Sequence, residues 1–441
     1  MVLIMMPCCM STMKDDNIYS GDYVYDEDGI IMKWYEDNYY YNPVIITNEA
    51  FYNWNENIFG YHTHLLNIDG FGEIVDNVFS IELINNQTAQ DTFLIYTEWL
   101  ANNYSYISDD AIVWEYNFDY FPYLQNAPWV SSMAQGGAIR IFLRAFLLTN
   151  NEYYLELAKK AVNSFKVDYE DGGFRQYDGD ANVYYEEYPG NPTSHVLNGF
   201  IFAIWGLYEY WIVTGDEDCH ALFLLGIETL KKRIADYDMG DNSKYDLIRL
   251  GQTFRFVIKE VFNNSQPLPV DSLYFYANSD ISKARTIDVG GNDIEGNTGN
   301  HSRVNNVSTE MWSEKAIDNG RTIRFFDFSQ ASFCSINFLV PENCNYPGSY
   351  SLKILYKDVS NDEYLVQIYD GRQYHDIGTI IGNSTELWVE NTFLFNEQFI
   401  RGREASFAYN EIHARQLLYT YKITGELIFK EYSDLFYSYN E

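Results

Sequence analysis

This chain has few cationic residues, few histidines and no pair of cysteines spaced for metal binding. Lys and Arg number 29 against 63 Asp and Glu, which gives a formal net charge of −34 at pH 7. A field of this sign repels polyanions, so nucleic acid and anionic membranes are not expected as partners, and a heavily sulfated ligand would need a local basic patch. Seven scattered histidines and no Cys-x-x-Cys pair leave a zinc site without support, and we expect no cofactor.

The chain also lacks a cysteine framework and a long uninterrupted apolar run. Five cysteines in 441 residues do not form a disulfide framework. The most apolar stretch, Val196–Val213, contains Asn198 and Glu209, so it predicts a buried core helix rather than a membrane span. Met1–Met13 is apolar without a basic start, as in a trimmed leader or an alternative start site. We expect a soluble protein, extracytoplasmic if a leader was trimmed, with its compartment otherwise open.

Aromatic residues are, by contrast, abundant. Hydrophobic residues make up 46% and aromatic residues 18% of the chain, too many for a disordered protein. The 40 tyrosines fit sugar-facing surfaces, because the ring stacks on a sugar while the hydroxyl makes hydrogen bonds. A biased composition explains the same number equally well, so the count alone does not decide function.

Apolar residues recur at helical spacing from Asn42 onward. Three junctions share an apolar residue, a threonine and then a polar or glycine cluster: Leu148–Glu152, Val213–Glu217 and Ile423–Glu426. Each supplies a residue suited to a helix C-terminus, followed by an acidic residue suited to a helix N-terminus. The pattern predicts αα-hairpins over residues 42–265 and 403–441, after an N-terminal extension over residues 1–41.

Residues 266–402 have a different pattern, with short alternating runs between Asn, Asp, Gly and Ser clusters. This predicts an inserted, jelly-roll-like antiparallel β-sandwich. The strand end Tyr369–Gly371 resembles carbohydrate-binding modules, with Trp388, Tyr374 and His375 as candidates for a sugar platform. A collar or a homodimer surface is an equally weighted alternative, because strand alternation alone puts aromatic residues in a sandwich core.

Two carboxylates and three phenols lie together in Tyr184–Tyr188, just before a predicted helix. Pro189 and Pro192 hold the backbone after this segment extended. The unpaired amides at the start of the helix favour an anionic group, such as a uronate carboxylate. Acidic, tyrosine-rich loops are common, so the segment alone predicts a site only weakly.

Several longer motifs are spread along the chain. They are Pro128–Gly136, Tyr185–Pro189, Val196–Phe200, Gly206–Tyr208, Tyr245–Leu247, Tyr409–Leu417 and Ile428–Glu431. In order and at matching separations, they resemble the C-terminal catalytic domain of heparosan or heparan sulfate D-glucuronyl C5-epimerases. The likeness covers roughly Asn42–Asn263 and Phe407–Glu441.

The resemblance implies a mainly α fold, an incomplete α/α toroid, with the site in a cleft of tyrosines and a glutamate. The catalytic residues that it implies are Glu187, Tyr188, Tyr245 and Tyr409, and Asn198 lies where the family contacts substrate. It implies an isomerase that converts D-glucuronate to L-iduronate within a uronate-containing polysaccharide.

Two departures from the family concern the region after Tyr245. The family's arginine three residues after this tyrosine is Ile248 here, and Arg249 follows. Either Arg249 takes its place or the uronate carboxylate is bound differently. The predicted insert also separates Tyr245 from Tyr409, which the family keeps close in sequence.

Inversion at C5 needs a base and an acid on opposite faces of the sugar, and donors that neutralise the neighbouring carboxylate. We assign Glu187 as the base and Tyr409 as the acid, since a tyrosine with its usual pKa near 10 is protonated at pH 7. Tyr245, Arg249 and the amides at the helix start are the expected carboxylate donors. His413, one helical turn after Tyr409, is a further substrate-binding candidate.

Two other functions fit the same pattern. A polysaccharide lyase also removes the C5 proton but then expels the C4 substituent, and toroidal lyases use Tyr and His. A non-catalytic glycan-binding protein is the second alternative, favoured by the Ile248 departure. The sequence does not identify the glycan.

Overall fold

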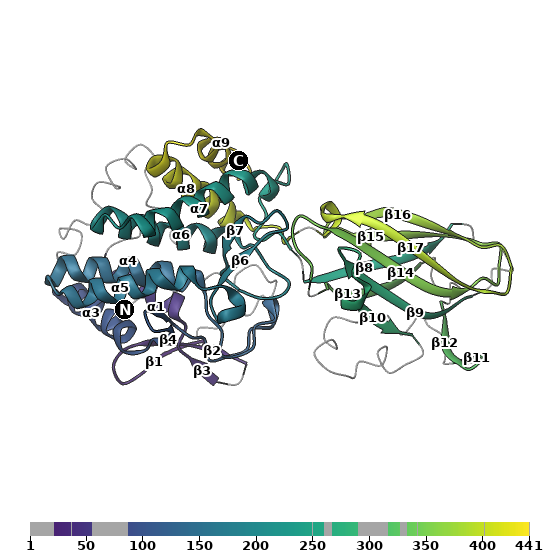
Figure 1. Cartoon of the computed structure of the whole chain (residues 1–441), viewed down its shortest axis with the longest axis horizontal. Helices are drawn as coiled ribbons and strands as arrows, with labels where there is room; N and C mark the ends of the chain where they lie inside the picture. Colours follow the sequence, from purple (N-terminus) through teal and green to yellow (C-terminus); the bar gives the residue numbers. More distant parts are fainter. Residues whose placement is uncertain are drawn as a thin grey trace. The chain divides into compact units, whose positions relative to one another are not determined.

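The chain forms two compact units. The computed structural model describes residues 22–36, 38–54, 87–248, 250–259, 267–289, 316–326, 333–341, 343–400 and 402–440. The first unit comprises Met1–Gly190, Ser194–Leu247 and Glu404–Glu441, and the second comprises Asn191–Thr193 and Ile248–Arg403. The described α-helices belong to the first unit, and the longest strands belong to the second (Figure 1).

The helices of the first unit pack in pairs. They are α1 (Pro43–Asn53), α3 (Gln87–Asn102), α4 (Ser132–Thr149), α5 (Glu152–Asn163), α6 (Leu197–Thr214), α7 (Glu217–Arg233), α8 (Phe407–Thr424) and α9 (Leu427–Ser438). Helix α4 contacts α1, α5 and α6, while α6 also contacts α7 and α8, and α8 pairs with α9. None of the helices in the described residues combines the length and the apolar character that a bilayer crossing needs.

Local capping explains three helical hairpins. Helix α4 ends at Asn150, and helices α6 and α8 end at Gly215 and Gly425, all three in the left-handed conformation. A left-handed residue stops a helix, and Gly and Asn adopt this conformation at low cost. Asp216 then caps α7 by accepting a hydrogen bond from the amide of Cys219. The hairpins α4–α5, α6–α7 and α8–α9 therefore follow from the three junctions that the sequence predicts.

Helices α4 and α6 cross in direct backbone contact. A Cβ added to Gly206 would lie 2.6 Å from the Cα of Gly136. One turn further along both helices, Glu209 of α6 binds Arg140 at 3.0 Å and Arg144 at 2.6 Å, with all three side chains buried. Because the contacts advance in the same direction along both helices, α4 and α6 are parallel and their N-termini lie at the same end of the unit.

The described residues of the first unit also contain three small antiparallel sheets. These are β1 (Tyr23–Tyr25), β2 (Ile31–Tyr35) and β3 (Asn38–Tyr40); β4 (Ser105–Ser108) with β5 (Ala111–Val113); and β6 (Arg175–Tyr177) with β7 (Val183–Tyr185). The ring of Tyr35 stacks on Phe118 at 3.7 Å, which ties the first sheet to the segment before α4. The β6–β7 hairpin leads directly into the predicted Glu-Glu-Tyr segment.

The second unit, in the part that the structure describes, has two antiparallel sheets around one core. The strands are β8 (Gly251–Ile258), β9 (Leu268–Ala277), β10 (Arg285–Asp288), β11 (Ala316–Asp318), β12 (Arg321–Phe326), β13 (Phe333–Leu339), β14 (Ser349–Lys357), β15 (Glu363–Tyr369), β16 (Tyr374–Ile381) and β17 (Trp388–Asn396). One sheet has the order β11-β12-β9-β14-β17 with β10 beside β9, and the other has the order β13-β8-β15-β16. Phe254 and Phe256 of β8 share a core with Phe275 of β9, so the inward faces of both sheets meet.

The three residues proposed as a sugar platform do not share a sheet. Tyr374 and His375 lie on β16 of the four-stranded sheet, whereas Trp388 lies on β17 of the six-stranded sheet. The guanidinium of Arg255 lies 3.6 Å from the centre of the Tyr374 ring, and His375 Nε2 is 2.6 Å from Asp370 Oδ2.

The predicted mainly α fold, an incomplete α/α toroid, is wrong. The described residues contain seventeen strands beside eight α-helices, and the second unit is rich in sheet. The helices of the described residues form pairs and layers and show no toroid. The prediction failed because strands of three to five residues, such as those of the first unit, are specified by hydrogen bonds to a partner segment rather than by a local apolar period.

Candidate active site

The β6–β7 hairpin carries the predicted Glu-Glu-Tyr segment to the N-terminal end of α4. The amide of Ser132, the first residue of α4, donates to the carbonyl of Glu186 at 3.0 Å, and its hydroxyl donates to the carbonyl of Tyr185 at 2.8 Å. On the other side, the amide of Glu186 donates to the carbonyl of Phe174 at 2.9 Å. The backbone just before Glu187 is therefore held by hydrogen bonds on both sides.

Glu187 is buried against the first turn of α6. Only 4% of the residue is exposed. A Cβ added to Gly199 of α6 would lie 2.2 Å from Glu187 Oε2 and 2.7 Å from Glu187 Cβ. The carboxylate thus occupies space that exists only because residue 199 has no side chain.

Tyr188 belongs to a stack of aromatic rings. Its ring centre lies 4.0 Å from that of Tyr123, with the planes 7° apart, and 5.7 Å from that of Trp129. The Tyr123 hydroxyl donates to Asp246 Oδ2 at 2.7 Å. Because Asp246 follows Tyr245 in the chain, the stack connects Tyr188 to the predicted Tyr-Asp-Leu motif.

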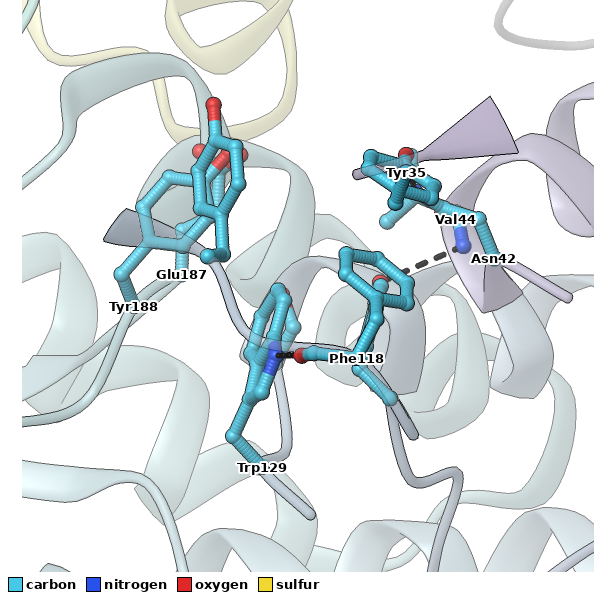
Figure 2. Close-up of a pocket in the computed structure, with 10 residues that line it drawn as sticks. Tyr35, Asn42, Val44, Phe118, Trp129, Glu187 and Tyr188 are labelled. Atoms are coloured by element: carbon cyan, nitrogen blue, oxygen red, sulfur yellow. Dashed lines mark hydrogen bonds between the residues drawn. The ribbon is translucent and has the colours of Figure 1, made fainter. Parts of the chain in front are cut away.

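Glu187 and Tyr188 line a pocket whose other walls are mainly aromatic, which we call the aromatic pocket. It is lined by Tyr35, Asn42, Val44, Tyr116, Phe118, Tyr120, Trp129, Ser131, Glu187 and Tyr188. In Figure 2, Glu187 and Tyr188 lie opposite Tyr35 and Asn42, with Trp129 below Glu187. This lining, within the described residues, has one carboxylate and no lysine or arginine. The pocket therefore offers ring faces and hydroxyl groups rather than positive charge.

Tyr245 and Tyr409 form a second group. Their ring centres are 4.8 Å apart with the planes at 81°, an edge-to-face contact between the segment before β8 and helix α8. The carbonyl of Tyr245 accepts a hydrogen bond from the amide of Leu197, the first residue of α6, at 3.0 Å. The ring pair is thus joined to the same helix end on which Glu187 lies.

His413 lies next to this pair and is uncharged at neutral pH. Its ring centre is 6.0 Å from that of Tyr409, and its Nδ1 is 2.8 Å from Ser243 Oγ. Burial lowers the pKa of His413 from 6.5 to about 3. His413 therefore supplies hydrogen-bonding capacity to the site but no positive charge.

Asn198 and Gln416 bring further buried polar atoms to the same place. Asn198, in the first turn of α6, is fully buried, and neither its side-chain nitrogen nor its side-chain oxygen has a hydrogen-bond partner among the described residues. Gln416 Nε2 donates to the carbonyl of Asn198 at 3.1 Å, while Gln416 Oε1 is buried without a partner. Buried polar groups are rarely left unpaired, so this junction of α6 and α8 has the capacity to bind a hydroxyl group or water.

The first turn of α6 is where most of the predicted site residues meet. Glu187 packs against Gly199, and the carbonyl of Tyr245 accepts a hydrogen bond from the amide of Leu197. Gln416 of α8 donates a hydrogen bond to the carbonyl of Asn198. At the two positions where the sequence departs from the family after Tyr245, Arg249 lies outside the described residues, and Ile248 is 1% exposed in the core of the second unit.

Sequence reasoning missed part of the pocket wall and one buried amide. Tyr35 and Asn42 lie in or beside the segment that was expected to be a simple N-terminal extension, and no local pattern marks them. Trp129 lies inside the quoted Pro128–Gly136 motif, and Gln416 lies three residues after His413 on α8. The motif could have indicated Trp129, and the helical spacing from His413 could have indicated Gln416.

Comparison with known protein families matches the part of the chain that contains the β6–α6 segment. Residues 108–256 match the family model of the D-glucuronyl C5-epimerase C-terminus. A D-glucuronyl C5-epimerase of Caenorhabditis elegans is 42% identical over 132 residues, which are 27% of this chain and 21% of that protein. An uncharacterized protein of Methanocaldococcus jannaschii is 34% identical over 140 residues, 31% of this chain and 46% of that protein.

The match does not extend over either relative as a whole, since the chain spans less than half the length of both. The matched range contains Glu187, Tyr188, Asn198 and Tyr245, whereas Tyr409 lies beyond it. Over residues 108–256, the predicted resemblance to the D-glucuronyl C5-epimerase family is confirmed.

Proposed function

We propose that this chain is an isomerase that inverts C5 of a uronic acid within a polysaccharide, converting D-glucuronate to L-iduronate. The observation that carries the proposal is the buried Glu187 carboxylate at the wall of an aromatic pocket, inside the range that matches the D-glucuronyl C5-epimerase C-terminus. Aromatic walls bind the apolar faces of sugar rings, and a carboxylate held away from water is a suitable base for a carbon acid.

The reaction requires proton transfer on two faces of the same carbon. In our proposal Glu187 removes the C5 proton and Tyr409 delivers a proton to the opposite face, and the reverse reaction exchanges these roles. Glu187 and the Tyr245–Tyr409 pair approach the first turn of α6 from different segments, which supports an arrangement with one group on each face. Tyr188 shapes the wall of the pocket through its stack with Tyr123.

Negative charge moves onto the uronate carboxylate when the C5 proton leaves, and preorganised donors must stabilise it. We propose Tyr245 and Arg249 for this role, with Asn198 and His413 binding sugar hydroxyl groups. The aromatic pocket has no lysine or arginine in its described lining and His413 is neutral, so Arg249 is the charged donor of this proposed set and the others are uncharged.

Isotope exchange in heavy water tests the proposal. With a non-sulfated uronate polymer as substrate, we expect deuterium at C5 without chain cleavage. An unsaturated product that absorbs in the ultraviolet would instead identify a lyase and refute the proposal. Binding of the polymer with neither reaction would identify a non-catalytic glycan-binding protein.

Two variants identify the proton-transfer groups. We expect Glu187→Gln and Tyr409→Phe each to reduce C5 exchange by about 10²-fold or more, since positioned acids and bases contribute on the order of 10² to 10⁴. Glu156→Gln and Tyr153→Phe, on the exposed side of α5, are matched controls that should keep full exchange. Full exchange in Glu187→Gln would remove Glu187 from the mechanism.

A further inference from the structure

Glu186 and His195 form a fully buried pair beside the proposed catalytic carboxylate. Glu186 Oε1 and His195 Nδ1 are 2.6 Å apart, and the two residues are 1% and 0% exposed. Glu186 Oε2 accepts hydrogen bonds from the backbone amide of His195 at 3.0 Å and from Ser194 Oγ at 3.1 Å. A single carboxylate therefore joins the two ends of the segment 186–195, which contains Glu187 and Tyr188.

The backbone of His195 is held in a sparsely populated conformation. Its φ is +53°, in the left-handed region that a Cβ disfavours. The Tyr184 ring stacks on the imidazole at 4.0 Å, and the Tyr237 hydroxyl donates to the carbonyl of His195 at 2.7 Å. Burial raises the pKa of Tyr237 well above its usual value, so this hydroxyl stays a donor. Contacts on the side chain and on both backbone polar groups of His195 thus fix this turn.

The same turn also binds the segment that contains Tyr245. The carbonyl of Ser194 accepts a hydrogen bond from the amide of Leu247 at 3.1 Å, and the amide of Leu197 donates to the carbonyl of Tyr245 at 3.0 Å. The turn at Ser194–Leu197 therefore lies between the two segments that supply the proposed base and one of the proposed carboxylate donors.

We propose that Glu186 and His195 are a positioning pair that fixes Glu187 and Tyr245 relative to each other for proton transfer at C5. This inference depends on the proposed function, because it assigns the pair a role in that reaction. Neither residue lines the aromatic pocket as described, so the pair acts through the backbone and not on the substrate. An imidazole at position 195 matters here for its Nδ1 hydrogen bond and not for proton transfer to substrate.

Two substitutions at position 195 separate positioning from folding. His195→Phe keeps an aromatic ring for the stack with Tyr184 but removes the hydrogen bond to Glu186. His195→Asn keeps a side-chain donor close to the position of Nδ1, and asparagine tolerates the left-handed conformation. His220→Phe is the matched control, because His220 of α7 also stacks on a ring, that of Trp211 at 3.8 Å, away from the site.

The first measurement is steady-state C5 exchange on the non-sulfated uronate polymer, expressed per folded molecule. We expect His195→Phe to lower kcat by about 100-fold with little change in KM, since a misplacement of the base by about 1 Å has an effect of this order. His195→Asn should recover most of kcat even where its Tm is as low as that of His195→Phe. The control His220→Phe should keep the wild-type kcat.

The second measurement is amide hydrogen exchange, which reports on the pair without any catalytic readout. His195→Phe should accelerate exchange at the amides of Leu197 and Leu247 while exchange in α5 stays unchanged. Unchanged exchange at both amides would overturn the inference, as would a wild-type kcat per folded molecule in His195→Phe. If the wild type itself shows no C5 exchange of substrate, the proposed function and the catalytic role of the pair both fail, whereas the amide data still show whether the pair holds these segments.

Discussion

Substitution of Gly199 by alanine offers a direct test of the position of Glu187. The new Cβ would lie 2.2 Å from Glu187 Oε2, 2.7 Å from its Cβ and 2.8 Å from its Cδ. Because non-bonded heavy atoms prefer separations of roughly 3.5 Å, the carboxylate must move by about 1 Å. The near end of the side chain is blocked as well as the far end, so rotation of the carboxylate alone does not relieve the contact.

The Gly199→Ala substitution should leave the protein folded while it lowers activity. Alanine is favoured over glycine within a helix by about 0.5–1 kcal/mol, while overpacking costs about 1–3 kcal/mol, so the free energy of unfolding should fall by about 0–2.5 kcal/mol. A displacement of the base by about 1 Å should lower kcat for C5 exchange by about 10²-fold. Urea unfolding and isotope exchange on the same preparation measure the two quantities.

Gly226→Ala is the matched control for this experiment. Its Cβ would meet the Ile204 Cγ2 methyl group at 2.5 Å, so the variant combines the same gain in helix propensity with a comparable steric contact, and it does not touch Glu187. We expect normal C5 exchange from it. Wild-type kcat in a folded Gly199→Ala protein would refute the assignment of Glu187 as the base, and equal losses in both variants would show that the effect comes from the fold.

Three further predictions concern buried groups. Burial alone would raise the pKa of Glu209, but the two guanidinium groups that bind it lower that pKa below its usual 4.5. The stabilisation that the Glu209 carboxylate contributes is therefore present above pH 4.5 and is lost as the pH falls further. Glu209→Gln should lower the free energy of unfolding by about 3 kcal/mol or more and make it depend less on pH in the acid range. The pKa of His413 is lowered from 6.5 to about 3, so the unfolded state binds a proton at a higher pH than the folded state does. The free energy of unfolding should therefore decrease as the pH drops below 6.5, by about 2 kcal/mol at pH 5, and it should depend less on pH in His413→Asn. Tyr409→Phe should keep the edge-to-face contact with Tyr245 and change Tm little, whereas Tyr409→Ala should cost about 3 kcal/mol, measured by thermal unfolding.

The sequence predicted those elements whose backbone conformation is determined by residues close in sequence. The hairpin α6–α7 was predictable because Gly215 and Asp216 stop one helix and start the next through contacts within a few residues. The strand β3, Asn38–Tyr40, was not predictable, since its three residues are strand only by pairing with β2. The mainly α prediction failed at such elements, where a partner segment decides the backbone conformation.

The same distinction applies to the site. The local segment, in which carboxylates, phenols and prolines are adjacent, predicts a site at Glu187 and Tyr188 only weakly, and the roles of these two residues follow from the resemblance to the epimerase family. Tyr35 lines the same pocket from another sheet, and nothing in its neighbourhood marks it, because its partners in the pocket wall, such as Trp129 and Glu187, lie far along the chain. Gly199 belongs to the Val196–Phe200 motif, yet the reason for a glycine there is its contact with the Glu187 side chain, which comes from another segment of the chain.

The charge of the chain and the walls of the pocket together predict an unusual salt dependence. The chain carries a net charge of −34, and the described lining of the aromatic pocket has no cation. A uronate polymer is therefore repelled as it approaches, and salt should screen this repulsion, with a Debye length of about 10 Å at 0.1 M. We expect KM for a non-sulfated uronate polymer to fall as ionic strength rises, with kcat unchanged, and a smaller change for a short oligosaccharide that carries a single carboxylate. A KM that rises with salt would mean that cations attract the polymer to the site, and recognition by uncharged rings and hydroxyl groups would then be wrong.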